Sequence, residues 1–282
     1  MSTRHRRRSQ WGVGIILAGS TIVLSPVVGA SPTSAALNSV RAAALATLRE
    51  GSAQVQFRGS TTAVGGAKSS ITGGGVLDFT HQLYSFTISI AAGPTTVVEK
   101  LVGSPGSTYL SVTDNGADIV KTLTTKSWVR VTSSTTSAPA NFNLLLQTQA
   151  LARPGVAVRA LGASSLDGQP VVGFRVTIPA KVMLSLSLQR LKSLHLSAAS
   201  LALVERATLR QGSQQVSIWV NSHDFIVEES AYQHLGLGAS AVTSTVATYL
   251  SHFGAPVSVS IPSASDSVTY ATFLREAKKY LG

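Results

Sequence analysis

The stretch YSFTISI at residues 84–90 decides the fold, because apolar and hydroxyl-bearing side chains alternate strictly along it. A period of two residues places the aromatic and branched side chains on one face of a strand and the hydroxyls on the other. Residues 53–58, with the sequence AQVQFR, repeat the pattern. Both stretches therefore predict half-buried strands of an antiparallel sheet.

Runs rich in Val, Ile, Thr and aromatic residues extend this pattern and predict about eleven strands in all. The turns between them carry residues that tolerate a positive φ, as in Asp114-Asn115-Gly116 and Asp167-Gly168, which favours hairpins joined as meanders. Gly73-Gly74-Gly75 predicts a bulge or bend within a strand. The further strands are expected at 70–79, 94–102, 107–113, 126–131, 155–161, 170–178, 213–220, 224–232 and 253–261.

Four segments have helical rather than strand periodicity: 35–49, 142–151, 180–208 and 268–281. The segment 180–208 has more Leu and Val than one narrow helix face needs, which is typical of a helix buried on several sides or lying over an apolar space. We expect it to act as a mobile cover. The predicted fold class is α+β, a strongly curved antiparallel half-barrel sheet with helices packed on its concave face.

Composition excludes several classes of function. The chain of 282 residues has no cysteine, so disulfides, thiolate zinc sites and cysteine nucleophiles are excluded. The formal net charge is +11, but Arg4, Arg6, Arg7 and Arg8 supply four of the positive charges and the others are dispersed. Dispersed charges do not make the basic footprint of a nucleic-acid-binding protein, so we expect no nucleic-acid partner.

Residues 1–30 have the organisation of a secretory signal peptide: a basic start, an uncharged apolar stretch from Trp11 to Val28, and small residues at the end. We expect cleavage between Ala30 and Ser31, with Thr33-Ser34-Ala35 as a second possible site. An uncleaved membrane anchor and a buried structural helix are the alternatives. Residues 31–282 are expected to form one extracytoplasmic domain, secreted or associated with the cell envelope, and a monomer.

Motifs for catalysis or cofactor binding are scarce. No Gly-x-Ser-x-Gly or Ser-x-x-Lys arrangement is present, and no two of the six histidines are spaced to share a metal on one strand or helix. Residues 236–241 match Gly-x-Gly-x-x-Ala without the surrounding βαβ pattern, which indicates a loop. Glu228 and Glu229 are adjacent on a predicted strand and point to opposite faces, so we interpret both as solvated. The sequence predicts no enzyme, no metal site and no cofactor.

The inner face of such a sheet is where apolar surface concentrates. Its alternating residues must be covered by helices or face a cavity, and periodicity leaves both a dry core and a lipid-accommodating hollow open. The candidate lining residues come from the alternating strands and from the segment 180–208. They are Phe57, Tyr84, Phe86, Ile88, Val129, Val172, Phe174, Val176, Val216, Ile218, Val227, Leu184, Leu188 and Leu191.

Short motifs spread over about residues 36–262 resemble a known family. They are the Ala/Leu-rich opening helix followed by Val55-Gln56-Phe57-Arg58-Gly59, the Leu110 strand reached through Gly103 to Tyr109, Trp128-Val129-Arg130-Val131 before a Leu-rich short helix, Val158 to Gly162 leading to Leu166-Asp167-Gly168-Gln169, Phe174-Arg175-Val176, Val216-Ser217-Ile218-Trp219-Val220-Asn221, and Phe225-Ile226-Val227. In this order they resemble LppX, LprA, LprF and LprG, the LolA-like lipid carriers of the actinobacterial envelope.

The resemblance implies a half-barrel whose hydrophobic cavity holds acyl chains of lipids or glycolipids, without catalysis. Members of this family usually end the leader in an acylated lipobox cysteine, whereas Val28-Gly29-Ala30-Ser31 stands here. The chain is therefore not expected to be a lipoprotein, and its membrane contacts are left to a basic surface or an uncleaved leader. The expected function is extracytoplasmic lipid binding or transfer. The alternative is an envelope scaffold or sensor domain with a filled core and a protein partner.

Overall fold

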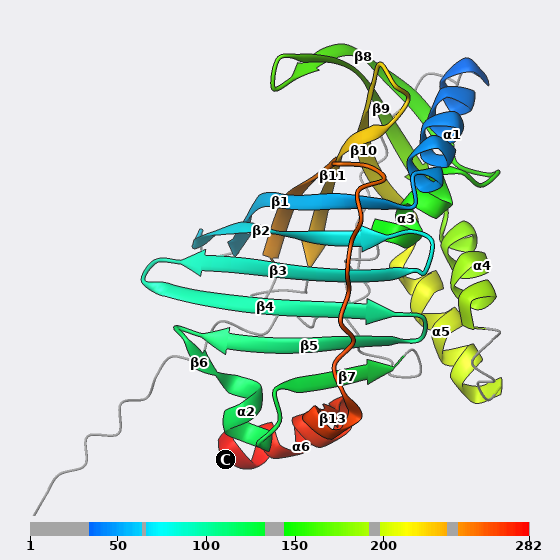
Figure 1. The fold of residues 1–282 in the computed structure, drawn as a ribbon. Helices are drawn as coiled ribbons and strands as arrows, with labels where there is room; N and C mark the ends of the chain where they lie inside the picture. The colour runs from blue at the N-terminus through cyan, green and yellow to red at the C-terminus, as the bar shows by residue number, and fades with distance from the viewer. Residues whose placement is uncertain (1–33, 64–65, 133–143, 192–197, 236–241, 282) are drawn as a thin grey trace, which may run out of the picture.

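A computed structural model describes residues 34–63, 66–132, 144–191, 198–235 and 242–281 of the chain. The expected leader at 1–30, with Ala30 and Ser31, and the Gly-x-Gly match at 236–241 lie outside these residues. The described part consists of one large sheet with helices packed on one of its faces, which is the α+β class expected from the sequence (Figure 1).

Thirteen strands form the sheet, and neighbouring strands are antiparallel except at one edge. Their order is β13-β7-β5-β4-β3-β2-β1-β12-β11-β10-β9-β8, with the short β6 pairing with β5. The bounds are β1 Ser52–Ala63, β2 Lys68–Asp78, β3 Leu83–Ala92, β4 Thr95–Ser104, β5 Ser107–Asp114, β6 Ala117–Asp118, β7 Trp128–Thr132, β8 Ala157–Leu166, β9 Gln169–Ile178, β10 Gln214–Asn221, β11 Ile226–Leu235, β12 Val242–Ser251 and β13 Ser267–Thr269.

Two meanders, β1 to β5 and β8 to β12, make up most of the sheet and are joined where β1 pairs with β12, while β7 and β13 extend it beyond β5. Figure 1 shows that the strands of the second meander run in a different direction from β2–β5, so the sheet is strongly bent. The hairpin turns have the expected positive φ values, 47° at Asn115 and 83° at Gly116, then 49° at Asp167 and 81° at Gly168. Such pairs match the right-handed twist of the flanking strands.

The helices are α1 Ser34–Arg49, α2 Ile119–Thr124, α3 Leu144–Leu151, α4 Ala180–Leu191, α5 Ala198–Gln211 and α6 Tyr270–Leu281. The segment expected as one helix at 180–208 is therefore two, α4 and α5. Both pack against each other, and α3 packs on α1 and α4. Side chains of α1, α2, α3, α4 and α6 join the strands in one core cluster, with Val40, Val120, Leu145, Met183 and Phe273 among the buried members.

The strand expected at 253–261 is wrong. Residues 253–263 have no strand pairing, although their exposure alternates as it would in a strand. Pro256 and Pro262 lack the N–H that a ladder requires. At its start, the segment is bound to Ser52 of β1 by hydrogen bonds of Gly254 and Ala255. It then crosses the sheet, as Figure 1 shows, and at its end Asp266 accepts a hydrogen bond from the Ser127 amide at 3.1 Å. The sequence reading instead missed β12, whose Thr and Ser residues dilute its apolar pattern.

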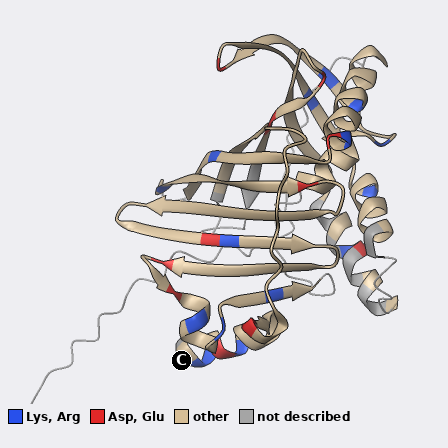
Figure 2. Cartoon of the chain, viewed as in Figure 1, with Lys and Arg blue, Asp and Glu red and all other residues tan. Residues whose placement is uncertain are grey.

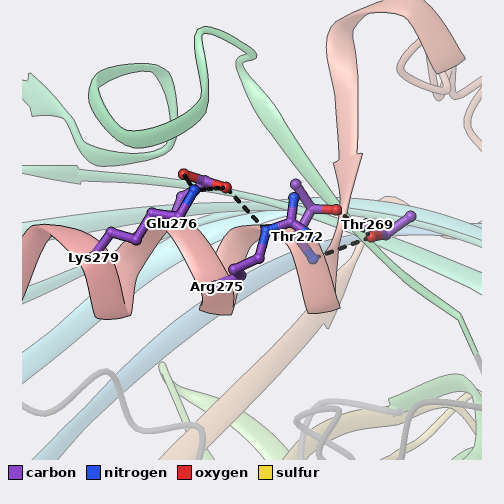
Figure 3. A network of polar contacts seen from close by, with 5 residues as sticks. All are labelled: Thr269, Thr272, Arg275, Glu276 and Lys279. Atoms are coloured by element: carbon purple, nitrogen blue, oxygen red, sulfur yellow. Dashed lines mark hydrogen bonds and ion pairs between the residues drawn. The ribbon is translucent and has the colours of Figure 1, made fainter.

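The C-terminal helix α6 contacts β7 and α2 and buries Tyr270 and Phe273. On its exposed side, the Glu276 carboxylate accepts hydrogen bonds from Lys279 Nζ at 3.0 Å and from Arg275 Nε at 3.1 Å, while Thr269 caps the first turn (Figure 3). Exposed pairs of this kind contribute little to stability. The two buried rings, and not the ion pairs, therefore hold α6 on the sheet.

Candidate functional site

The candidate site is the inner face of the sheet, defined here as the face whose side chains join the helices in the core cluster. One transverse row of ladder partners crosses it. The row runs through Val112, Glu99, Ile88, Gly73, Phe57, Thr248, Glu229, Ile218 and Phe174, from β5 to β9. Directly paired residues share a face, so every member of this row points to the same side.

Three aromatic side chains form the centre of the first meander's inner face. Phe86 meets Phe57 edge-on at 5.1 Å between ring centroids, and Tyr84 stacks on Phe86 at 5.0 Å. The Tyr84 hydroxyl lies 3.0 Å from Thr108 Oγ1, which satisfies its polar end. All three rings are buried. This cluster gives the inner face a large, ordered apolar surface.

Two glycines, which lack a side chain, leave room for the rings of Tyr84 and Phe86. A Cβ at Gly103 would lie 2.0 Å from Cε1 and Cζ of Tyr84, and one at Gly75 would meet both the Ser85 carbonyl and the Phe86 ring. Of the bulge or bend expected at Gly73-Gly74-Gly75, the bulge is wrong, because β2 pairs with both neighbours without a register shift. These glycines serve close approach of strands and rings instead.

Most predicted lining residues lie in the core. Those of the strands that are buried in the core cluster are Phe57, Tyr84, Phe86, Ile88, Val129, Phe174, Val176, Val216 and Ile218. Leu184 and Leu188 of α4 are half-buried, as is Val227, the unpaired residue at a bulge between β10 and β11. The side chain of Leu191 lies outside the described part. Their role in lining a cavity stays a prediction.

Val172 lies on the same face of β9 as Phe174 and Val176, but it is not buried there, because its side chain is 44% exposed. Val172 pairs with Ala163 of the edge strand β8, whose residues 159–165 are all exposed. This end of the β8–β9 hairpin projects beyond the helices, as Figure 1 shows. Periodicity gives the face of a residue but not whether another element covers that face.

Helix contacts with the sheet concentrate at its two ends. Among the described residues, α1 packs on β8 and β11 and α3 on β9, while α2 packs on β5 and β7 and α6 on β7 and β13. No described helix makes a contact of comparable extent with β1, β2, β3 or β4. The middle of the inner face, which carries the aromatic cluster, therefore lies between two groups of helices.

Glu229 corrects a second expectation, since it is not solvated. The side chain is 3% exposed, and its Oε2 is buried with no hydrogen-bond partner. Its ladder partners are Ile218 and Thr248, so it points to the inner face. Burial raises the pKa of Glu229 to about 8. Glu228, the preceding residue, is half-buried on the outer face opposite Trp219 and Tyr249.

The sequence held a signal for Glu229 that was not used. Two adjacent strand residues point to opposite faces, so one of this pair had to face inward. Val227 was expected to face inward, and Glu229 has the same parity. The bulge at Val227 is what keeps Ile226 and Glu229 on one face despite their odd separation.

Glu99 is a second carboxyl group on this face, between Ile88 and Val112 in the row. It is half-buried, and desolvation raises its pKa. Five strand spacings separate it from Glu229 along the sheet, which is about 24 Å at 4.8 Å each. The row between the two carboxyl groups contains Ile88, Gly73, Phe57 and Thr248.

Charges are sparse over β1–β5 and gather around α2 and α6 (Figure 2). Within the described residues, no three His, Asp or Glu side chains are grouped as metal ligands. No helix there has both the length and the apolar character that a membrane span requires.

Comparison with known proteins gives likenesses of fold. LprF from Mycobacterium bovis matches over 83% of this chain and 100% of its own, at 13% identity and a TM-score of 0.40. The Mycobacterium tuberculosis lipoprotein LppX matches over 80% and 98%, at 16% identity and a TM-score of 0.40. A LolA superfamily protein from Nitrosomonas europaea matches over 77% and 91%, at 12% identity and a TM-score of 0.25. LprF and LppX carry names of the family that the sequence motifs resemble.

No protein-family model matches the chain. No curated protein matches it either.

Proposed function

We propose that this protein is an extracytoplasmic lipid-binding or lipid-transfer protein, which holds the acyl chains of a lipid or glycolipid against the inner face of its bent sheet. We propose that it is not an enzyme. The observation that carries it is the distribution of helices over the sheet. The inner face has buried apolar side chains from β7 to β9, and helix contacts gather at its two ends, with β1–β4 and the aromatic cluster of β1 and β3 between them.

Acyl chains suit this face for a physical reason. Burial of each methylene group contributes about 0.8 kcal/mol, so two long chains supply ample affinity without specific contacts. Selectivity then comes from the few polar groups that face the same space, among which Glu99 and Glu229 are the charged candidates. The half-buried leucines Leu184 and Leu188 of α4 support a role of the α4–α5 segment as a cover that opens at a membrane.

The location follows from the leader expected at residues 1–30, which directs the domain out of the cytoplasm. With no cysteine in the chain, the protein reaches membranes from solution or through an uncleaved leader. A mildly basic surface favours contact with anionic headgroups. We propose a monomer.

The decisive experiment is native mass spectrometry of residues 31–282, exported by an actinobacterial host, followed by solvent extraction. A stoichiometric lipid adduct that disappears on extraction is the expected result. The extracted protein is then offered vesicles that contain the extracted lipid. A mass without adduct, and no uptake from the vesicles, would contradict lipid binding.

The second candidate is an envelope scaffold or sensor domain with a filled core. The low exposure of the inner-face side chains favours it, since Phe57, Phe86 and Ile218 are each at most 2% exposed. A filled core needs no ligand, and such a protein binds a partner elsewhere on its surface, for example along the free edge of β8. The same measurement separates the two candidates, because a scaffold carries no lipid adduct and takes none up.

A further inference from the structure

We infer that Glu229 is the polar anchor of the bound lipid, and that its carboxyl group donates a hydrogen bond to an ester carbonyl of the acyl chains. This inference rests on the proposed lipid binding and names its substrate class: acyl esters, in preference to lipids of the same shape without carbonyl oxygens. It has three supports, which are the unpaired oxygen, the place of the side chain and the lack of a charged neighbour.

The unpaired oxygen is the first support. Buried side-chain oxygens in native proteins nearly always have a hydrogen-bond partner, because an unsatisfied one loses the free energy of its hydration. Glu229 Oε2 has none among the described residues, although the side chain is 3% exposed. A carboxyl group retained in such a place indicates a partner that comes from outside the chain.

The place of the side chain is the second support. Glu229 lies in the transverse row between Thr248 and Ile218, and Phe57 follows Thr248 on β1. It therefore lies on the same face of the sheet as the aromatic cluster. A lipid whose chains lie along Phe57 and Phe86 would bring its ester groups within reach of a group at this end of the row.

The charges around Glu229 are the third support. The elements packed against β11 are β10, β12 and α1. β10 has no titratable side chain, and Tyr249 of β12 is paired with Glu228 on the outer face. The titratable groups of α1 are Arg41 and Arg49, and neither lies within ion-pair distance of Glu229 in the structure. Among the side chains that the structure describes, no cation is paired with Glu229, and burial is the cause of its raised pKa.

The protonation state determines which ligand group fits. Since burial raises the pKa of Glu229 to about 8, the carboxyl group carries its proton at neutral pH. A protonated carboxyl donates one hydrogen bond, and the carbonyl oxygen of an ester accepts one without a charge of its own. A lipid amine would instead be an ammonium ion, which favours an ionised partner.

The chain offers a matched control in Glu228. It is the adjacent residue of the same strand and the same chemical type, but it lies on the outer face. Glu229→Gln keeps a hydrogen-bond donor at the inner position and cannot ionise. Glu229→Leu keeps the volume roughly and removes the donor. Glu228→Gln makes the same change as Glu229→Gln without touching the inner face.

The test measures binding of two probes to residues 31–282 by native mass spectrometry at pH 6.5 and pH 9. The probes are a diacylglycerol and the dialkyl ether that differs from it only in lacking both carbonyl oxygens. We expect the wild type to prefer the ester about tenfold at pH 6.5, the factor that one buried hydrogen bond supplies. The preference disappears at pH 9, where Glu229 ionises.

The variants separate the anchor from other sources of selectivity. Glu229→Gln keeps the preference at both pH values, Glu229→Leu loses it at both, and Glu228→Gln behaves as the wild type. Equal binding of the two probes by the wild type, or a preference that survives in Glu229→Leu, overturns the inference and leaves lipid binding standing. If the wild type binds neither probe, the proposed function fails and the inference fails with it.

Discussion

At the scale of single residues, Gly103 and Tyr84 share a space that admits one side chain. The Tyr84 ring lies where a Cβ of residue 103 would be, and it is held there by Phe86 and by the hydrogen bond with Thr108. The ring thus depends on a residue of the next strand that has no side chain. Close packing of this kind makes even one added methyl group costly.

We predict that Gly103→Ala destabilises the protein by about 1–3 kcal/mol, the range for overpacking a well-packed core. Urea unfolding monitored by circular dichroism measures the free energy. The control is the same change in a Tyr84→Ala background, where the methyl group meets no ring and the cost should largely vanish. An equal cost in both backgrounds would contradict the steric explanation.

The pH dependence of stability is a second residue-scale prediction. Because the pKa of Glu229 rises from its ordinary 4.5 to about 8 on folding, the native state retains a proton that the unfolded chain releases between these values. The free energy of unfolding should therefore fall as the pH rises from 4.5 to 8. Glu229→Gln removes this contribution, so its denaturation midpoint should depend less on pH over that window than that of the wild type. Parallel curves for the two proteins would show that Glu229 titrates normally.

What the sequence predicted at this scale was the face of a residue more than its burial. Phe57, Phe86 and Ile218 were placed correctly, because alternation along a strand is local information. The burial of Val172 and of Glu229 was predicted wrongly, for the same physical reason in both cases. Whether a strand face is covered depends on elements far away in the sequence, and a bulge such as that at Val227 shifts parity without changing the composition.

At the scale of elements, the helices α4 and α5 form a detour between two paired strands. Ile178 at the end of β9 is the direct ladder partner of Gln214 at the start of β10. The backbone of the sheet is therefore already closed at this point, and the connection can be as short as a hairpin turn. The helices serve some other purpose than linking the strands.

We predict that replacing residues 179–213 by Asn-Gly leaves a folded sheet and abolishes lipid retention. Asn-Gly forms the two-residue turn that fits an antiparallel pair, so β9 and β10 keep their register. Far-UV circular dichroism and cooperative thermal unfolding test the fold, and native mass spectrometry tests the adduct. A shortened protein that still carries lipid would show that α4 and α5 are not the cover.

Element prediction succeeded where the period was unambiguous and failed where composition obscured it. The helix at 35–49 and the strands around residues 55 and 86 were found because each has a long, clean period. β12 was missed because Thr and Ser occupy half of its positions, and 253–261 was mistaken for a strand because an extended segment alternates in exposure whether or not it is paired. The local sequence does not determine which distant segment a strand will pair with.

At the scale of the whole molecule, both meanders and the helices α1, α2, α3, α4 and α6 contribute to one core cluster. A shared core couples the parts, because neither meander can be lost without exposing apolar surface of the other. We predict a single unfolding transition, with calorimetric and van't Hoff enthalpies that agree. Two resolved transitions in the calorimetric trace of residues 31–282 would contradict this and would make each meander an independent folding unit.

The pairing of β1 with β12 also has a consequence for the order of folding during synthesis. Each meander assembles from neighbours in sequence, but the seam between them joins residues such as Gln54 and Ser251, near opposite ends of the described chain. Contacts so distant in sequence form slowly, because the entropy of closing the long loop is lost before the contacts contribute any stability. Until β12 is delivered, β1 is an unprotected edge. A chain built in this way cannot complete its sheet until β12 has been synthesised, which fits the export in an unfolded state that we propose for this protein.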